Sequence, residues 1–86
     1  NSMQVYVIGK VNSPGRFVIS SNINVLQALA MAGGLNPFAD KDAIRIMREQ
    51  ADGATRSFYF DYTNVLRGDN LEQNIRLQRG DVVVVP

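Results

Sequence analysis

The sequence predicts an α+β domain in which a small mixed sheet of about five strands packs on one main helix, with a second short helical turn. Three observations carry this prediction: two pairs of β-rich segments, one amphipathic segment that ends in two glycines, and a final run of four valines. The 86 residues are 45% hydrophobic and 20% charged, which is typical of one soluble globular domain. A chain of this length buries roughly 60% of its unfolded surface, so its core is just large enough to fold alone.

The first pair of strands lies before residue 20. Gln4–Ile8 has apolar side chains at alternate positions on both faces, which predicts an inner strand covered on both sides. Asn12-Ser13-Pro14-Gly15 is a turn sequence, because Pro sets φ and the following Gly accepts positive φ. Arg16–Ile19 then resumes an extended pattern, so we expect a β-hairpin.

A polar connection over Ser20–Asn22 leads to the main helix. Asn24 has the character of an N-cap, and Gln27 lies where a reciprocal capping partner belongs. The helix should end at Gly33-Gly34, since glycine takes the left-handed conformation that closes a helix. Four residues are expected to form the narrow face that packs on the sheet: Leu26, Leu29, Ala30 and Gly33, with both leucines buried.

A second hairpin follows the helix. Ala43–Glu49 alternates with Ile44 and Ile46 on one side, and Thr55–Phe60 alternates in the same way. Asp52-Gly53 between them indicates a turn, within a loop longer than two residues.

The last third of the chain contains a helical turn and a final strand. Asp61–Leu66 begins with an acidic cap and predicts one short helical turn, whereas Leu71–Leu77 is expected to be irregular. Arg79-Gly80-Asp81 is a turn before Val82–Val85, whose β-branched run predicts a central strand buried on both faces. Hairpin, helix, hairpin, helical turn and central strand together make the order of a β-grasp domain.

Composition and motifs exclude several functions. The chain has no His and no Cys, and no Gly-x-Ser-x-Gly or Ser-x-x-Lys pattern, so we predict no enzymatic activity and no cofactor. Nine Lys and Arg residues are dispersed among eight acids, which argues against a nucleic-acid partner. No apolar run approaches the ~20 residues that span a bilayer. Asp40 and Asp42 lack the further acids of a calcium loop, so no metal site is predicted.

The motifs resemble a known family from end to end. The stretches that carry the resemblance are Val5-Tyr6-Val7-Ile8-Gly9, Pro14-Gly15, Asn24 to Leu29, Ala32-Gly33-Gly34-Leu35, and Gly80-Asp81 followed by Val82 to Pro86. This pattern is similar to the soluble-ligand-binding β-grasp (SLBB) domain, and more closely to SLBB modules of bacterial polysaccharide export proteins. The domain would cover residues 4–86, with residues 1–3 an expression remnant or linker.

The resemblance implies a function that the composition does not show. It implies a module of a periplasmic or outer-membrane export protein for capsule or exopolysaccharide, with the other subunits of an export ring and the polysaccharide as partners. The module itself would not insert into the membrane. Two alternatives remain: a purely structural oligomerisation module, and a β-grasp domain that binds a small, cobalamin-like ligand.

Three groups of residues are candidates for ligand binding. Asn36, Phe38 and Asp40 combine an aromatic face with an amide and a carboxylate, a set that suits a sugar, although Phe38 has the alternative role of covering the core. The Gly33-Gly34 amides would approach a ligand closely, although as a helix stop they need none. The third group is a set of arginines that suit acidic sugars or a neighbouring subunit, with a solvated surface as the alternative: Arg45 and Arg48, with Arg16 and Arg56.

Arg-Gly-Asp occurs twice, at residues 67–69 and 79–81. Both copies lie where turns are required, and Gly and Asp are routine turn residues. We therefore interpret both tripeptides as turns rather than adhesion motifs.

Overall fold

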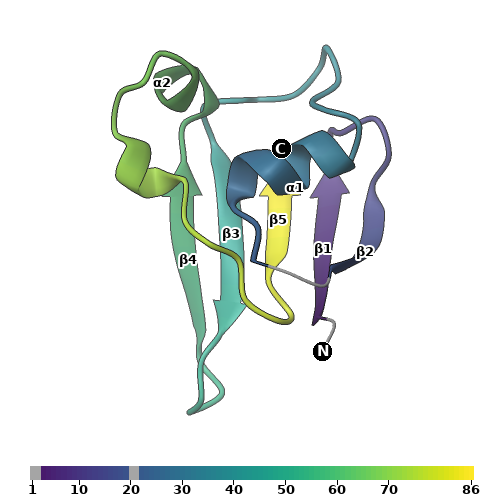
Figure 1. Cartoon of the computed structure of the whole chain (residues 1–86), viewed down its shortest axis with the longest axis vertical. Helices are drawn as coiled ribbons and strands as arrows, with labels where there is room; N and C mark the ends of the chain where they lie inside the picture. Colours follow the sequence, from purple (N-terminus) through teal and green to yellow (C-terminus); the bar gives the residue numbers. More distant parts are fainter. Residues whose placement is uncertain (1–2, 20–21) are drawn as a thin grey trace.

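The computed structural model describes residues 3–19 and 22–86, which form a mixed five-stranded sheet (Figure 1). The strands are β1 (Met3–Gly9), β2 (Gly15–Ile19), β3 (Ile44–Glu49), β4 (Thr55–Phe60) and β5 (Val82–Val85). Their order across the sheet is β2-β1-β5-β3-β4, with β1 and β5 parallel and the other pairs antiparallel. Both predicted hairpins and the central position of the valine run are confirmed.

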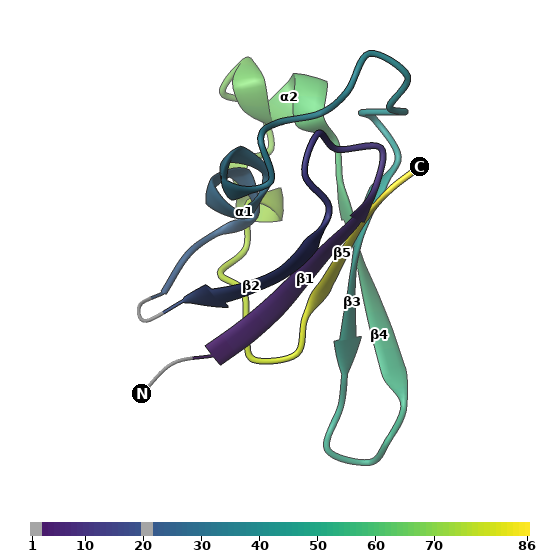
Figure 2. The ribbon, with the colours of Figure 1, turned by 90° about the vertical axis from the view of Figure 1, so that its right-hand side faces the viewer.

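Three helical segments accompany the sheet. They are α1 (Val25–Met31), α2 (Tyr62–Leu66) and a 3-10 turn, η1 (Leu71–Gln73). Figure 2 shows α1 and α2 on the same side of the sheet. Because η1 lies inside the segment that we expected to be irregular, that prediction was wrong there. The turn forms because Asn70 takes a positive φ of 49° and Asn74 N donates to Leu71 O at 3.0 Å.

Two predicted segments lie partly outside the residues that the structure describes. Met3 belongs to β1 and pairs with Ile19, whereas residues 1–2 of the predicted remnant lie outside the described residues. Ser20 and Ser21 of the predicted polar connection also lie outside them. No helix in the described ranges is both long enough and apolar enough to cross a bilayer.

The start and end of α1 confirm the signals in the sequence. Asn24 Oδ1 accepts from Gln27 N, and Gln27 Oε1 accepts from Asn24 N, each at 2.9 Å, which completes a capping box. At the other end, Gly33 N donates to Ala30 O and Gly34 N donates to Leu29 O. These two bonds form a Schellman motif, and Gly33, the first residue after the C-cap Ala32, takes the positive φ that it requires.

The face of α1 that packs on the sheet differs from the predicted one. Ala30 and Gly33 are exposed and Leu26 is only half-buried, so of the predicted face only Leu29 is fully buried. The buried residues recur at the predicted helical spacing, but their series starts at Val25 rather than at Leu26. The buried face consists of Val25, Ala28, Leu29 and Ala32. Its two alanines are short, which allows the helix to lie close to the sheet.

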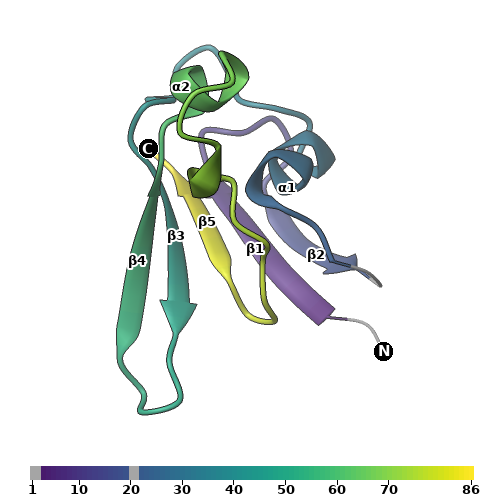
Figure 3. The same cartoon turned by 60° about the vertical axis from the view of Figure 1, so that its left-hand side comes forward.

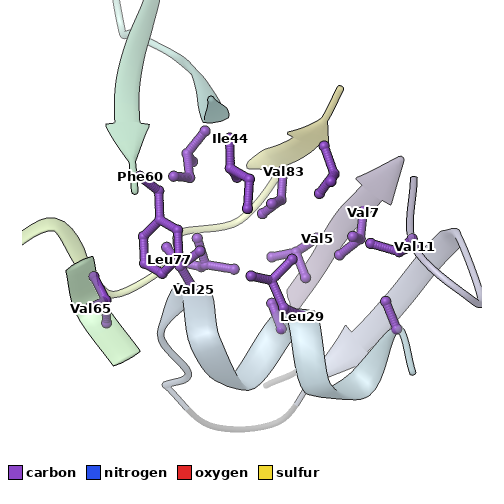
Figure 4. Close-up of a cluster of buried hydrophobic side chains, with 14 of the residues drawn as sticks. Val5, Val7, Val11, Val25, Leu29, Ile44, Phe60, Val65, Leu77 and Val83 are labelled. Carbon is purple, nitrogen blue, oxygen red and sulfur yellow. The ribbon is translucent and has the colours of Figure 1, made fainter. Parts of the chain in front are cut away.

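The core lies between α1 and the face of the sheet that it covers (Figure 4). Leu29 and Val25 of α1 point toward valines and isoleucines of the central strands, and Phe60 and Leu77 close one end of the cluster. The buried residues are Val5, Val7, Val11, Ile19, Val25, Ala28, Leu29, Ala32, Ile44, Ile46, Phe60, Val65, Leu77, Val83 and Val85.

The opposite face of the sheet has no second layer in the described structure, and this corrects two predictions. Val82 and Val84 are only half-buried, and Ile8 is 45% exposed, so neither β5 nor β1 is buried on both sides. We call this surface the open face. The strand registers place on it Gln4, Tyr6, Ile8, Arg16, Val18, Arg45, Met47, Ser57, Tyr59, Val82 and Val84. Figure 3 shows the β3–β4 hairpin extending past the other strands at one end.

Candidate functional site

The double glycine after α1 has its backbone groups in internal hydrogen bonds. Besides the two amides of the Schellman motif, Gly33 O accepts from Asn12 Nδ2 at 2.7 Å and Gly34 O accepts from Asn12 N at 3.0 Å. Because both N–H groups already donate within the chain, they are not available to hold a ligand. Gly33 and Gly34 fix the start of the next loop instead.

That loop, residues 36–40, is held at both ends. Asn36 N donates to Lys10 O at 3.0 Å, and Asp40 N donates to Pro86 O at 2.7 Å. Between them, Ala39 is partly buried against the core. The loop is therefore fixed to the residue after β1 at one end and to the residue after β5 at the other. We call it the Phe38 loop.

Phe38 stands at the surface of this loop with 82% of its area exposed. It does not cover the core, so the structural alternative for this residue is wrong. Asn36 Oδ1 accepts from Phe38 N at 2.8 Å, which leaves the Asn36 NH₂ group without a hydrogen-bond partner among the described residues. Asp40 is also exposed, and its carboxylate has no hydrogen-bond partner among the described residues. An aromatic face, an NH₂ donor and a carboxylate acceptor thus share one ordered loop.

The two candidate arginines of β3 lie on opposite faces of the sheet. Arg45 is exposed on the open face, with its guanidinium 5.6 Å from the centre of the Tyr59 ring. Arg48 lies on the face that carries Ile46, since residues two apart share a side of a strand. Their odd spacing separates them, so they do not form one site with each other.

Arg48 forms a salt bridge that the sequence analysis missed. Its Nη2 lies 2.7 Å from Asp81 Oδ2 and its Nε lies 3.0 Å from Asp81 Oδ1, while Arg76 O accepts a further bond from Nη2. Gln78 N also donates to Asp81 Oδ2 at 2.8 Å. The Arg48 and Asp81 side chains are only 14% and 1% exposed.

This salt bridge corrects the interpretation of Asp81 as a routine turn residue. The Asp81 carboxylate is buried and paired with Arg48, so this copy of Arg-Gly-Asp presents no free acid. Phe58 adds a second neighbour to Arg48, with the guanidinium 4.8 Å from its ring centre. The tripeptide itself does not distinguish Asp81 from Asp69, although Val82 follows one and Asn70 follows the other.

Asp42, which follows the Phe38 loop, interacts with side chains at the start of α2. A hydrogen bond from the Thr63 side chain lowers the pKa of Asp42. Among residues 3–19 and 22–86, no group of three or more acidic, His or Cys side chains is placed to hold a metal ion.

A polar cavity beside the start of α1 also escaped the sequence analysis. It has a volume of about 450 Å³ and is lined by Asn22, Ile23, Asn24, Gln27, Asn74 and Arg76. Its two walls are about 50 residues apart in the chain, and the sequence pattern indicates only a helix-capping role for Asn24 and Gln27. The run of amides between residues 22 and 27 was the one signal that pointed to it.

The sheet order and the helical segments define the class of this protein, a small α+β module with the β-grasp fold. Residues 3–85 match the SLBB domain family, so the chain belongs to that family. The SLBB domain is a binding domain that is found in polysaccharide export proteins. No curated protein matches the chain.

Proposed function

We propose that this SLBB domain is a non-enzymatic module of a bacterial polysaccharide export protein, exposed to the periplasm, and that it contacts the exported glycan through the Phe38 loop. Membership of the SLBB family supports the export setting. The observation that carries the glycan contact is the exposure of Phe38 on a loop fixed at both ends. Its partners in this function are the polysaccharide and the neighbouring subunits of an export ring.

The chemistry of the loop suits a sugar. One face of a pyranose ring presents C–H groups, which pack on the flat face of an aromatic side chain. The hydroxyl groups around the ring both donate and accept, so they pair with the Asn36 NH₂ and the Asp40 carboxylate on either side of Phe38. Because hydrogen bonds already hold the loop, little ordering entropy is lost on binding. Such a contact is shallow, and repetition around a ring would strengthen it through effective concentration.

We expect Phe38→Ala to weaken oligosaccharide binding about fivefold to tenfold, because an aromatic contact contributes about 1 kcal/mol. The measurement is a titration of the ¹⁵N-labelled domain with neutral and acidic oligosaccharides at millimolar concentration, following the amides of residues 34–40. Leu66→Ala is the matched control, since Leu66 is 62% exposed on α2. An absence of shifts in this loop with every oligosaccharide would contradict the proposal.

A second candidate function is a purely structural oligomerisation module, and the open face favours it. Ile8, Val18 and Tyr59 expose apolar surface there, on a side of the sheet that no described segment covers. This function predicts self-association without any sugar. It is compatible with a glycan contact at the Phe38 loop, because the two surfaces use different residues.

For this second candidate we expect Ile8→Lys to shift the domain toward monomer at high protein concentration, because a charge on the open face opposes its burial. Sedimentation equilibrium measures the change. Leu66→Lys places the same charge at an exposed apolar residue of α2 and should leave the association unchanged. A wild-type domain that stays monomeric at millimolar concentration would exclude this function for the isolated chain.

A further inference from the structure

The polar cavity beside α1 has two fixed walls. One wall is the chain that enters α1, and the other is the segment after η1. Val25 N donates to Ile75 O at 3.2 Å and Leu77 N donates to Ile23 O at 2.8 Å, so backbone hydrogen bonds hold the walls together. Val25 and Leu77 are themselves buried in the core. The cavity is therefore a built feature of the fold rather than a gap between loose loops.

The orientation of three amide side chains in the cavity follows from their hydrogen bonds. Gln27 N donates to Asn24 Oδ1 and Asn24 N donates to Gln27 Oε1. Asn74 Oδ1 accepts from Leu26 N at 3.0 Å, across the cavity wall. A backbone N–H only donates, so each of these contacts identifies the side-chain amide oxygen. The NH₂ group of each side chain takes no part in these bonds. The backbone amides at the start of α1 are already used by these bonds.

At Asn24, Gln27, Asn74 and Arg76, the side-chain groups left over are all donors. Within residues 3–19 and 22–86, the NH₂ groups of Asn24, Gln27 and Asn74 have no hydrogen-bond partner, and the Arg76 guanidinium forms no ion pair. No acidic side chain lines the cavity. The Asp81 carboxylate is paired with Arg48, which also donates to the carbonyl of Arg76.

This donor set selects a class of ligand. Three NH₂ groups and one guanidinium require a ligand with several acceptor oxygens, and a single cation matches a single negative charge. A carboxylate suits the planar fork of arginine, and ring and hydroxyl oxygens suit the amides. The volume of about 450 Å³ lies within the range of roughly 300–1,000 Å³ typical of small-ligand pockets.

We propose that the cavity binds a uronate, a pyranose sugar with one carboxylate, with Arg76 on the carboxylate and the NH₂ groups of Asn24, Gln27 and Asn74 on ring and hydroxyl oxygens. The carboxylate and hydroxyl recognition follows from the donor set, whereas the choice of a sugar to carry them rests on the proposed function. The site is separate from the Phe38 loop, with which it shares no residue.

A ¹⁵N–¹H correlation spectrum tests this directly, because side-chain NH₂ groups of Asn and Gln give their own signals. D-glucuronate should shift the NH₂ signals of Asn24, Gln27 and Asn74, and D-glucose should bind at least tenfold more weakly because it lacks the charge. Acetate serves as the probe for a bare carboxylate. If acetate binds as tightly as glucuronate, or if glucuronate leaves the three NH₂ signals unmoved, the proposal is overturned.

Isosteric variants test the donors without removing the helix cap. Asn24→Asp and Gln27→Glu each keep the acceptor oxygen of the capping box and replace the NH₂ group by a charged oxygen. Each should retain the thermal midpoint of the wild type and weaken glucuronate binding at least tenfold. Gln50→Glu adds the same charge in the loop after β3 and should bind like the wild type. Equal binding by all three variants would overturn the proposal.

The same spectra separate this site from the proposed function. Oligosaccharide shifts confined to residues 34–40 would overturn the cavity site and leave the proposed glycan contact standing. Glucuronate shifts confined to the cavity, with the Phe38 loop silent to every oligosaccharide, would support the cavity site and contradict the contact through Phe38.

Discussion

Gly9→Ala is expected to remove about 4 kcal/mol or more of folding free energy, an exceptionally large effect for one methyl group. Gly9 pairs with Val85 in the parallel contact between β1 and β5, and its φ is +96°. A Cβ at this position would overlap the carbonyl oxygen of Val85 and lie 2.9 Å from its carbonyl carbon. That oxygen also accepts from Lys10 N at 2.8 Å, so the overlap is relieved only if the central strands separate.

The expected loss approaches the whole stability of the domain. At about 0.05–0.15 kcal/mol per residue, a domain of this length is stable by roughly 4–13 kcal/mol. Urea unfolding followed by circular dichroism measures the change. Gly53→Ala is the matched control, because Gly53 has a similar φ of +89° but open space where the Cβ would lie. It should lose only about 1–2 kcal/mol, and equal losses in the two variants would show that the overlap with Val85 does not matter.

Asp81→Ala is expected to destabilise the domain by about 3–5 kcal/mol, the usual effect of removing one partner from a buried ion pair. The variant leaves the Arg48 guanidinium, with only 14% of its side chain exposed, without its carboxylate. It also leaves Gln78 N without the acceptor that it now has at 2.8 Å. Both groups would then be desolvated without compensation.

Two further variants isolate the ion pair. Asp69→Ala changes the same residue in the other Arg-Gly-Asp copy, where the side chain is exposed, and should change stability by no more than about 0.5 kcal/mol. Arg48→Ala combined with Asp81→Ala should lose less than the two single losses added together, because the pair is coupled. Additive losses would show that Arg48 and Asp81 do not depend on each other.

Much of the fold was predictable because its signals are local. The Asn24 and Gln27 capping pair and the double glycine after α1 each act within a few residues. Such local signals predict where helices and strands lie even when the segments that they pack against are not known. The burial of each face was less predictable, since it depends on a second layer. Val82 and Val84 are apolar on a side that nothing in the described structure covers.

The candidate site shows the same division. The Phe38 loop was recognisable from its residues, because aromatic, amide and carboxylate groups lie within five positions. The fixed position of the loop was not recognisable, because it depends on backbone hydrogen bonds to Lys10 and Pro86, at opposite ends of the chain. Arg45 and Arg48 look alike in the sequence, yet the pleat of β3 sends one to the open face and the other to Asp81.

The sequence by itself determined the elements, their order and the family, because capping, turn and strand propensities are properties of neighbouring residues. Only the tertiary structure decided which of two identical tripeptides contains a buried carboxylate, and which amides are left with unused donors. Asp81 and Asp69 each follow Arg-Gly, and Asn24 meets the segment of Asn74 only after the chain has folded. Burial and pairing depend on residues that are distant in the sequence, and the neighbouring residues of a side chain do not determine which of them it will contact.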